Sequence, residues 1–208
     1  MININNLKYW NNFYKKKKHK ITPTNFSKFC ITFLKKDDVL FDLGCGNGRD
    51  VLFFEKKGIN VFGIDKSAAG INSIKLKKLR KGNLLVGDFS KINLENITND
   101  YFSIYMRFSL HAITSLQEKN FFKKVLKYKK IKFMFIETRT VNDELYKIGK
   151  KVGNNEYIAS HYRRFIVPKL IKNEIKKKFR IIYFKVAKGF AKYKKEDPKV
   201  LRIVALKC

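Results

Sequence analysis

The 208-residue sequence is 45% hydrophobic and carries 47 Lys and Arg against 17 Asp and Glu, a formal net charge of +30. This composition excludes a disordered chain, and the length predicts a single domain, residues 1–208, with a sizeable core. No apolar run reaches the roughly 18 residues of a membrane span, and three cysteines without paired spacing predict a cytoplasmic protein with neither a disulfide framework nor a zinc site.

Residues 1–34 are predicted to form helices ahead of the first strand. Aromatic residues recur at helical spacing from Leu7 to Tyr14, and Pro23 precedes a second helix that ends near Leu34. These helices either pack against the edge of the sheet or form a lid, from which Tyr9 or Tyr14 reaches a bound ligand. We take a helical lid as the working hypothesis, because one helix can do both.

A strand, a glycine-rich turn and a helix follow one another in residues 39–50, VLFDLGCGNGRD. Glycine lets the backbone turn sharply and approach a ligand closely, and the helix N-terminus adds N–H donors and a positive dipole end. The glycines could also serve turn geometry alone, and Cys45 is interpreted as a small residue that fits there. The stretch predicts a nucleotide-sized cradle made by Asp42, Gly44, Cys45, Gly46, Asn47, Gly48 and Arg49.

Two further apolar strands also end in an acid. The segment VFGID ends in Asp65, followed by Lys66, and LLVGDF ends in Asp88 and Phe89. A carboxylate at the end of the second strand of a doubly wound sheet can accept from both hydroxyls of a ribose, which is the role predicted for Asp65. Asp88 and Phe89 suit an adenine, with the carboxylate accepting from the amine and the ring packing on the base.

Charged residues end the predicted fourth and fifth strands. Arg107 ends YFSIYMR, and Glu137 and Arg139 end IKFMFIETR. These strand ends lie over the crevice where such sheets bind ligands. The alternative for Glu137 and Arg139 is a mutual surface ion pair worth little, and the alternative for His111, at the start of the next helix, is a histidine satisfied by the backbone.

Residues 140–167 form an unusually long connection after the fifth strand. Long ordered loops are usually functional or disordered, and this one is too aromatic for disorder, so we expect it to cover the substrate. Arg163 and Arg164 point opposite ways in an extended segment, so one should face the substrate while the other pairs with an acid. The candidate substrate contacts in the connection are Tyr157, His161, Tyr162, Arg163 and Arg164.

The last two predicted strands, residues 180–187 and 200–207, have no helix between them and must therefore be antiparallel or nearly so. A helix that starts at Pro168 precedes them. The pattern predicts an α/β fold with a Rossmann-like, seven-stranded, mostly parallel sheet, helices on both faces and an antiparallel last strand.

The motifs FDLGCGNGRD, FGID and VGDF resemble those of class I S-adenosylmethionine-dependent methyltransferases, and they look most like the tellurite-resistance-like and sugar or small-molecule O-methyltransferase branch. Dinucleotide-binding dehydrogenases favour G-x-G-x-x-G, where this chain has Arg49 as the last position. The segments RFSLHAI, IETR, HYRRF and EDP are similar to a bacterial group linked with surface polysaccharide or small-molecule modification. The resemblance implies S-adenosylmethionine as cofactor, Tyr9 and Arg107 as further cofactor contacts, and a seventh strand inserted between the fifth and sixth.

The arginines indicate the chemical class of the acceptor. Only eight of the 47 basic residues are arginine, and a guanidinium binds carboxylate or phosphate bidentately, which lysine does less well. We therefore expect O-methylation of a small anionic or sugar-derived acceptor, with Arg107 and Arg139 among its contacts. An alcohol acceptor needs a general base, for which His111, His161 and Glu137 are candidates, whereas an anionic oxygen needs none.

Two alternative functions stay open. The charge favours an RNA methyltransferase, but the lysines lie in helical stretches where a solvated face explains them, and the fourth strand ends in MRFS without the Asn/Asp-Pro-Pro-aromatic tetrapeptide of amino-directed enzymes. The other alternative is a non-catalytic, cofactor-binding partner subunit. No metal is expected, since the three histidines are scattered.

Overall fold

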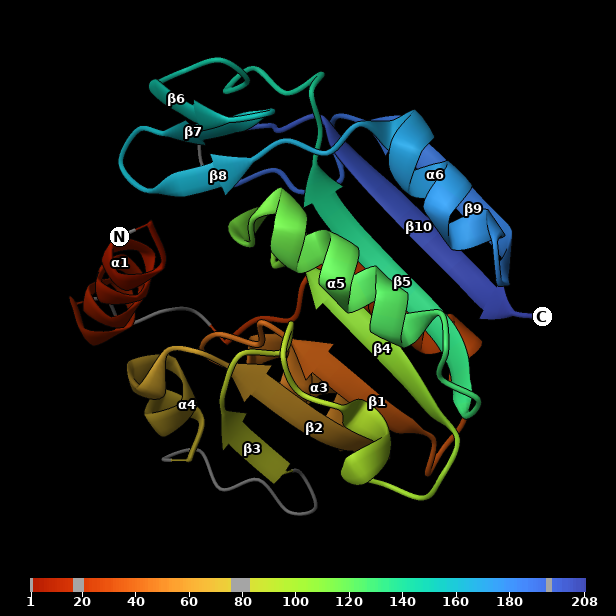
Figure 1. Ribbon diagram of the computed structural model, residues 1–208. Helices are drawn as coiled ribbons and strands as arrows, with labels where there is room; N and C mark the ends of the chain where they lie inside the picture. Colours follow the sequence, from red (N-terminus) through yellow and green to blue (C-terminus); the bar gives the residue numbers. More distant parts are fainter. Residues whose placement is uncertain (1, 17–20, 76–82, 194–195) are drawn as a thin grey trace.

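A computed structural model describes residues 2–16, 21–75, 83–193 and 196–208. Its centre is a seven-stranded sheet in the order β3-β2-β1-β4-β5-β10-β9 (Figure 1). The strands β3, β2, β1, β4 and β5 run parallel, and β10 is antiparallel to both of its neighbours, which confirms the predicted fold. The strands are β1 Val39–Leu43, β2 Asn60–Asp65, β3 Asn83–Val86, β4 Phe102–Arg107, β5 Ile131–Arg139, β9 Phe179–Ala187 and β10 Val200–Lys207.

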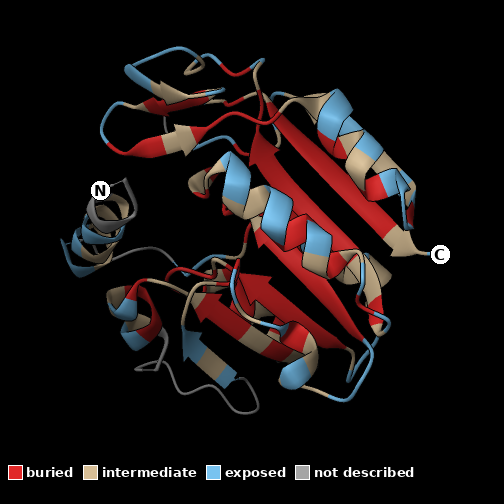
Figure 2. Ribbon diagram, viewed as in Figure 1, coloured by how far each residue is buried: buried red, intermediate tan, exposed pale blue. Residues whose placement is uncertain are grey.

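Helices cover both faces of this sheet. In Figure 1, α5 and α6 lie in front of the sheet and α3 lies behind it, and each face has its own cluster of buried apolar side chains. Figure 2 shows buried strands between helices whose outer faces are exposed. The helices of the sheet are α2 Asn25–Cys30, α3 Arg49–Lys56, α4 Ala68–Lys75, α5 Ser115–Val125 and α6 Pro168–Lys176, with short 3-10 turns at Ile31–Phe33, Leu94–Asn96 and Leu110–Ala112.

Local sequence explains where two of these helices begin. The helix after β4 was expected to open at His111, but that residue lies in a 3-10 turn and α5 begins at Ser115. Thr114 and Gln117 form a reciprocal capping box there, which satisfies the first N–H groups of the helix. Pro168 opens α6 as predicted, at a position where its missing N–H costs nothing.

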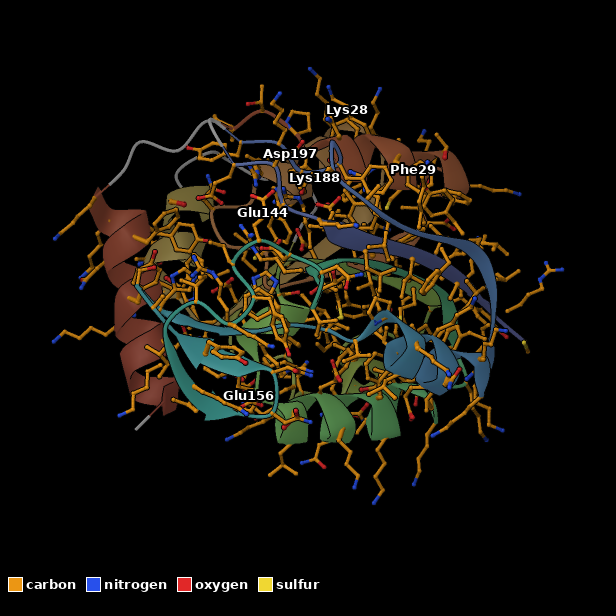
Figure 3. All side chains as sticks on the ribbon, turned by 90° about the horizontal axis from the view of Figure 1, so that it is seen from above. Lys28, Phe29, Glu144, Glu156, Lys188 and Asp197 are labelled. Atoms are coloured by element: carbon orange, nitrogen blue, oxygen red, sulfur yellow. The ribbon has the colours of Figure 1, made fainter. Side chains whose placement is uncertain are left out.

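The long connection of residues 140–167 contains a small antiparallel sheet, which we call the cover sheet after its predicted role. Its strands are β6 Lys150–Gly153, β7 Glu156–Ile158 and β8 Tyr162–Arg164. The base of the insertion is closed, since the Ile166 N–H donates to the Arg139 carbonyl over 3.1 Å. At one side the Ser115 N–H donates to Glu156 over 2.8 Å, and at the other the insertion meets the β9–β10 connection, where Figure 3 shows Glu144, Lys188 and Asp197 together.

The first helix, α1 Ile2–Lys16, lies apart from the sheet, between α4 and the cover sheet in Figure 1. Asn11 on α1 accepts from the Ser67 hydroxyl over 2.8 Å, just before α4, and Tyr9 stacks on His161 beside β8 with ring centroids 4.3 Å apart. The helix therefore bridges two regions that flank the carboxyl ends of the parallel strands.

Candidate active site

The glycine turn has the geometry of a close ligand approach. Gly44, Gly46 and Gly48 have φ values of 83°, 56° and 67°, a region that favours glycine. A Cβ added to Gly46 would lie 2.1 Å from the Tyr14 hydroxyl, so the side chain of Tyr14 rests directly on the turn. Of the two tyrosines expected to reach the ligand, Tyr14 lies here, whereas Tyr9 lies on His161.

Asp65 ties the turn to the start of α4. Its two carboxylate oxygens accept from the Gly46 N–H over 2.8 Å and from the Ser67 N–H over 2.7 Å. Burial raises the pKa of Asp65, and these two N–H groups oppose the shift. A carboxylate offers about four lone-pair directions, so two remain for a ligand. These two open acceptor positions fit the two hydroxyl donors of a ribose diol lying over the glycine turn.

The acid that ends the third strand is held by its neighbours. Asp88 forms an ion pair of 2.9 Å with Lys66 and accepts from the Ser90 hydroxyl over 2.6 Å, which agrees with its lowered pKa. The ring of Phe89 is buried in the core and edge-on to Phe121 at 5.7 Å, so its packing on an adenine stays a prediction.

The sequence analysis missed Asp50, which organises the other face of the turn. Its carboxylate is buried and accepts from the Thr24 N–H, the Ser27 hydroxyl and the Tyr105 hydroxyl, each over 2.8 Å. These bonds join the start of α2, the first turn of α3 and the middle of β4. The only sequence signal was an acid in the first turn of a helix that follows a glycine motif.

Glu137 occupies a different place from the one expected. Its side chain is 0% exposed and lies between two arginines, with Arg202 Nε 2.6 Å from one oxygen and Arg107 Nε 3.0 Å from the other. The Arg107 contact is an ion pair whose geometry is too oblique for a hydrogen bond. The structure therefore contradicts both a surface pair with Arg139 and an oxygen that can reach the crevice as a base.

Two other candidate arginines are also paired. Arg139 Nη1 donates to both oxygens of Asp143 over 3.0 Å, and its Nη2 donates to Glu196 over 2.9 Å. Arg164 pairs with Glu118 on α5 and donates to the backbone carbonyls of Leu110 and Ile113, in the turn before α5. The acidic partner of Arg164 confirms the expectation that one of the two adjacent arginines pairs with an acid.

Within the described part of the chain, Arg49 and Arg163 are the candidate arginines without an ion pair. Both are half-buried. Burial and the nearby Arg107 lower the pKa of Arg49, and burial and the nearby Arg139 lower the pKa of Arg163. A half-buried charge near a like charge is unfavourable until an anion neutralises it, so both guanidinium groups are suited to bind anions.

Both candidate histidines are buried and are weak bases. Burial, followed by the charges of Arg163 and Arg139, lowers the pKa of His161 to about 3, and His161 Nδ1 lies 3.0 Å from the Ser160 hydroxyl. Burial lowers the pKa of His111 well below its usual range, and its Nδ1 lies 3.5 Å from the Thr138 hydroxyl. Efficient general bases have a pKa near the working pH, so this environment does not favour base catalysis by either.

Phe108 is a second residue that the sequence analysis missed. It follows β4 with a φ of 55°, a conformation that is costly for a bulky side chain and recurs at functional sites. Its ring lies 4.5 Å from the Arg107 guanidinium and is edge-on to His111 at 5.4 Å. No local sequence signal predicts this conformation.

The remaining candidates are mostly buried parts of the framework. Burial, followed by the charges of Asp50 and Asp65, raises the pKa of Asp42. The buried candidates are Asp42, Cys45 and Asn47 at the turn and Tyr157 and Tyr162 in the cover sheet.

No cluster of three metal-binding side chains occurs among the described residues, and no helix in that part is long and apolar enough to cross a membrane.

Comparison with known sequences identifies one family. The sequence profile of the family described as tellurite resistance protein TehB matches residues 7–158. A comparison with curated proteins finds no significant match.

Solved structures share the fold at low identity. An S-adenosylmethionine-dependent methyltransferase from Methanosarcina mazei has a TM-score of 0.72 and 18% identity over 86% of this chain and 96% of that chain. A TehB-like S-adenosylmethionine-dependent methyltransferase from Corynebacterium glutamicum has a TM-score of 0.63 and 13% identity over 97% of this chain and 95% of that chain. Magnesium protoporphyrin IX methyltransferase from Synechocystis, solved with bound S-adenosylmethionine, has a TM-score of 0.63 and 9% identity over 88% of this chain and 76% of that chain.

Proposed function

The chain belongs to the tellurite resistance protein TehB family, and on this premise we propose that it transfers a methyl group from S-adenosylmethionine to an oxygen of a small anionic or sugar-derived acceptor. It is an S-adenosylmethionine-dependent methyltransferase by family and by fold. The acceptor class is our inference. The observation that carries it is the half-buried guanidinium of Arg163, which has no ion pair among the described residues.

The residues around the glycine turn fit the cofactor. We assign the ribose hydroxyls to the open lone pairs of Asp65, the exocyclic amine of the adenine to Asp88, and the carboxylate of the methionine part to Arg49. Tyr14 covers the turn from α1 and is suited to exclude water from it. Bound S-adenosylmethionine would supply a sulfonium methyl group whose carbon an ionised oxygen can attack; the thioether S-adenosylhomocysteine would be the leaving group, and no proton would need to be moved.

The acceptor lies, in this proposal, between β5, the cover sheet and α1. Arg163 holds its anionic group, while the charge of Arg139 is already balanced by Asp143 and Glu196. Tyr9 and His161 form a stacked wall beside Arg163. Holding an acceptor in line with the methyl group is the main contribution that a protein makes to such a displacement.

The nucleophile is, in this proposal, already ionised. Burial raises the pKa of Glu137, but its carboxylate is 0% exposed and enclosed by two arginines, so an acceptor cannot reach it. The pKa values of His111 and His161 are both lowered, so neither histidine is suited to accept a proton at neutral pH. A carboxylate or phosphate oxygen needs no base. This supports an acid or a phosphate ester over a neutral alcohol.

A labelled-methyl transfer screen tests the proposal. Purified protein is incubated with methyl-labelled S-adenosylmethionine and with sugar nucleotides, phosphate esters, carboxylic acids or total RNA. We expect label in an anionic small molecule, with precursors of surface polysaccharide among the candidates. Label in RNA would support the RNA methyltransferase instead, and cofactor binding without any transfer would support the partner subunit. We further propose a cytoplasmic location, since all three cysteines are free.

A further inference from the structure

A hollow lies beside Arg163, within the insertion and away from the glycine turn. It is lined by Leu145, Ile148, Tyr157, Ala159, Arg163 and Phe165, and it is a shallow depression that encloses about 30 Å³ before it opens to solvent. The lining is apolar except for one guanidinium and one phenol. A site for a sugar carries several hydrogen-bonding groups, and this one does not.

The walls of the hollow are rigid. The ring of Tyr146 packs edge-on against Phe165 at 5.5 Å, and its hydroxyl donates to the Asn155 side chain over 2.7 Å. Gly149 has a φ of 98°, and a Cβ added there would lie 2.4 Å from the Ile158 carbonyl oxygen, so the backbone of this turn is already in close contact. The hollow is therefore a built feature of the cover sheet that cannot collapse easily.

Apolar surface and an unpaired charge meet at the hollow. Ile148 is 55% exposed at its rim, which would be ordinary for an isolated residue. Here it adjoins the side chain of Arg163, whose guanidinium is half-buried and has no ion pair among the described residues. A ligand that satisfies both features carries an anionic group next to an apolar group.

We propose that the hollow is the acceptor subsite, and that the acceptor is a small amphiphilic anion whose charged group pairs with Arg163 while a short alkyl group enters the hollow from its open side. This inference rests on the proposed function in that it takes the bound anion to be the acceptor. It narrows the acceptor class from anionic or sugar-derived molecules to apolar carboxylates and phosphate monoesters.

Calorimetric titration with simple carboxylates tests the subsite. Acetate, butyrate, hexanoate and benzoate are titrated into the full chain with and without S-adenosylhomocysteine. Each buried methylene is worth about fourfold in affinity, so butyrate, which has two more methylenes, should bind about fifteenfold more tightly than acetate. Arg163→Gln should weaken all four, because the anion loses its partner.

Substitutions at two exposed positions separate binding in the hollow from the effect of altering an exposed side chain elsewhere on the surface. Ala159→Trp fills the hollow from an exposed position and should abolish the gain from acetate to hexanoate while leaving acetate unchanged. The matched control is Leu170→Asn, which removes an apolar side chain that is 65% exposed outside the hollow and should change nothing. Equal affinities for acetate and hexanoate, or an unchanged gain in Ala159→Trp, would overturn the subsite. Failure of the chain to bind S-adenosylhomocysteine would instead overturn the proposed function.

Discussion

Replacing Glu137 by glutamine keeps the shape of the side chain and removes the negative charge that lies between the buried Arg202 and the half-buried Arg107. The Arg202 and Arg107 nitrogens lie 2.6 and 3.0 Å from its oxygens, and the carboxylate is 0% exposed. At about 4 Å between charge centres and an effective dielectric constant of about 20, each pair contributes about 4 kcal/mol of attraction. Desolvation offsets part of this, so breaking the buried arrangement should lower the free energy of unfolding by about 3–5 kcal/mol.

Urea unfolding followed by far-ultraviolet circular dichroism measures this loss, and thermal unfolding should shift by about 2–4 °C for each kcal/mol. The matched control is Glu196→Gln, since Glu196 pairs with Arg139 but is 63% exposed. An exposed pair is worth at most about 1 kcal/mol. The reasoning fails if Glu137→Gln is no more destabilising than the control. A stable Glu137→Gln variant with strongly reduced turnover would restore Glu137 as a catalytic group.

Three further predictions concern the turn and the cover. Asp65→Ala should weaken S-adenosylhomocysteine binding by about 1–3 kcal/mol, because the ribose hydroxyls lose an ionised acceptor; unchanged affinity by calorimetry would refute the assignment. Gly46→Ala should destabilise the fold by about 1–2 kcal/mol from its positive φ alone, and the contact with Tyr14 should add to this, so Tyr14→Ala in the same chain should recover only the second part in thermal unfolding. His161 has a pKa of about 3, below its value in the unfolded chain, so its contribution to stability is fully present above about pH 6.5 and is lost as the pH falls toward 3. His161→Phe should therefore flatten the dependence of unfolding free energy on pH in this range, and an unchanged slope would contradict the buried, neutral histidine.

The sheet could be predicted because its signals are local. Each parallel strand is a short apolar run, and β1 is buried at all five positions, as expected where helices cover both faces. The absence of a helix between β9 and β10 was enough to predict their antiparallel pairing. The strands of the cover sheet are only three or four residues long, and such short strands carry no alternation from which they could be recognised.

The partners of charged side chains could not be predicted. Glu137 and Arg139 end the same strand, and proximity in sequence suggested that they pair. The register of the sheet places Glu137 opposite Arg202 on β10 instead, 65 residues later in the chain. Which arginines remain available for a ligand therefore depends on long-range pairing. Arg164 has an acidic partner, Glu118, 46 residues earlier in the chain, whereas its neighbour Arg163 has none among the described residues.

The position of β10 has a consequence for synthesis of the protein. This strand lies between β5 and β9 and is the neighbour of both, yet it follows them in the chain. A nascent chain that has left the ribosome only as far as residue 199 thus exposes unpaired backbone along β5 and has no sheet partner for β9. Such edges promote pairing with other chains. Folding of this half of the sheet must await residues 200–207, so a slowed or interrupted translation should produce aggregation before it produces a partly active enzyme.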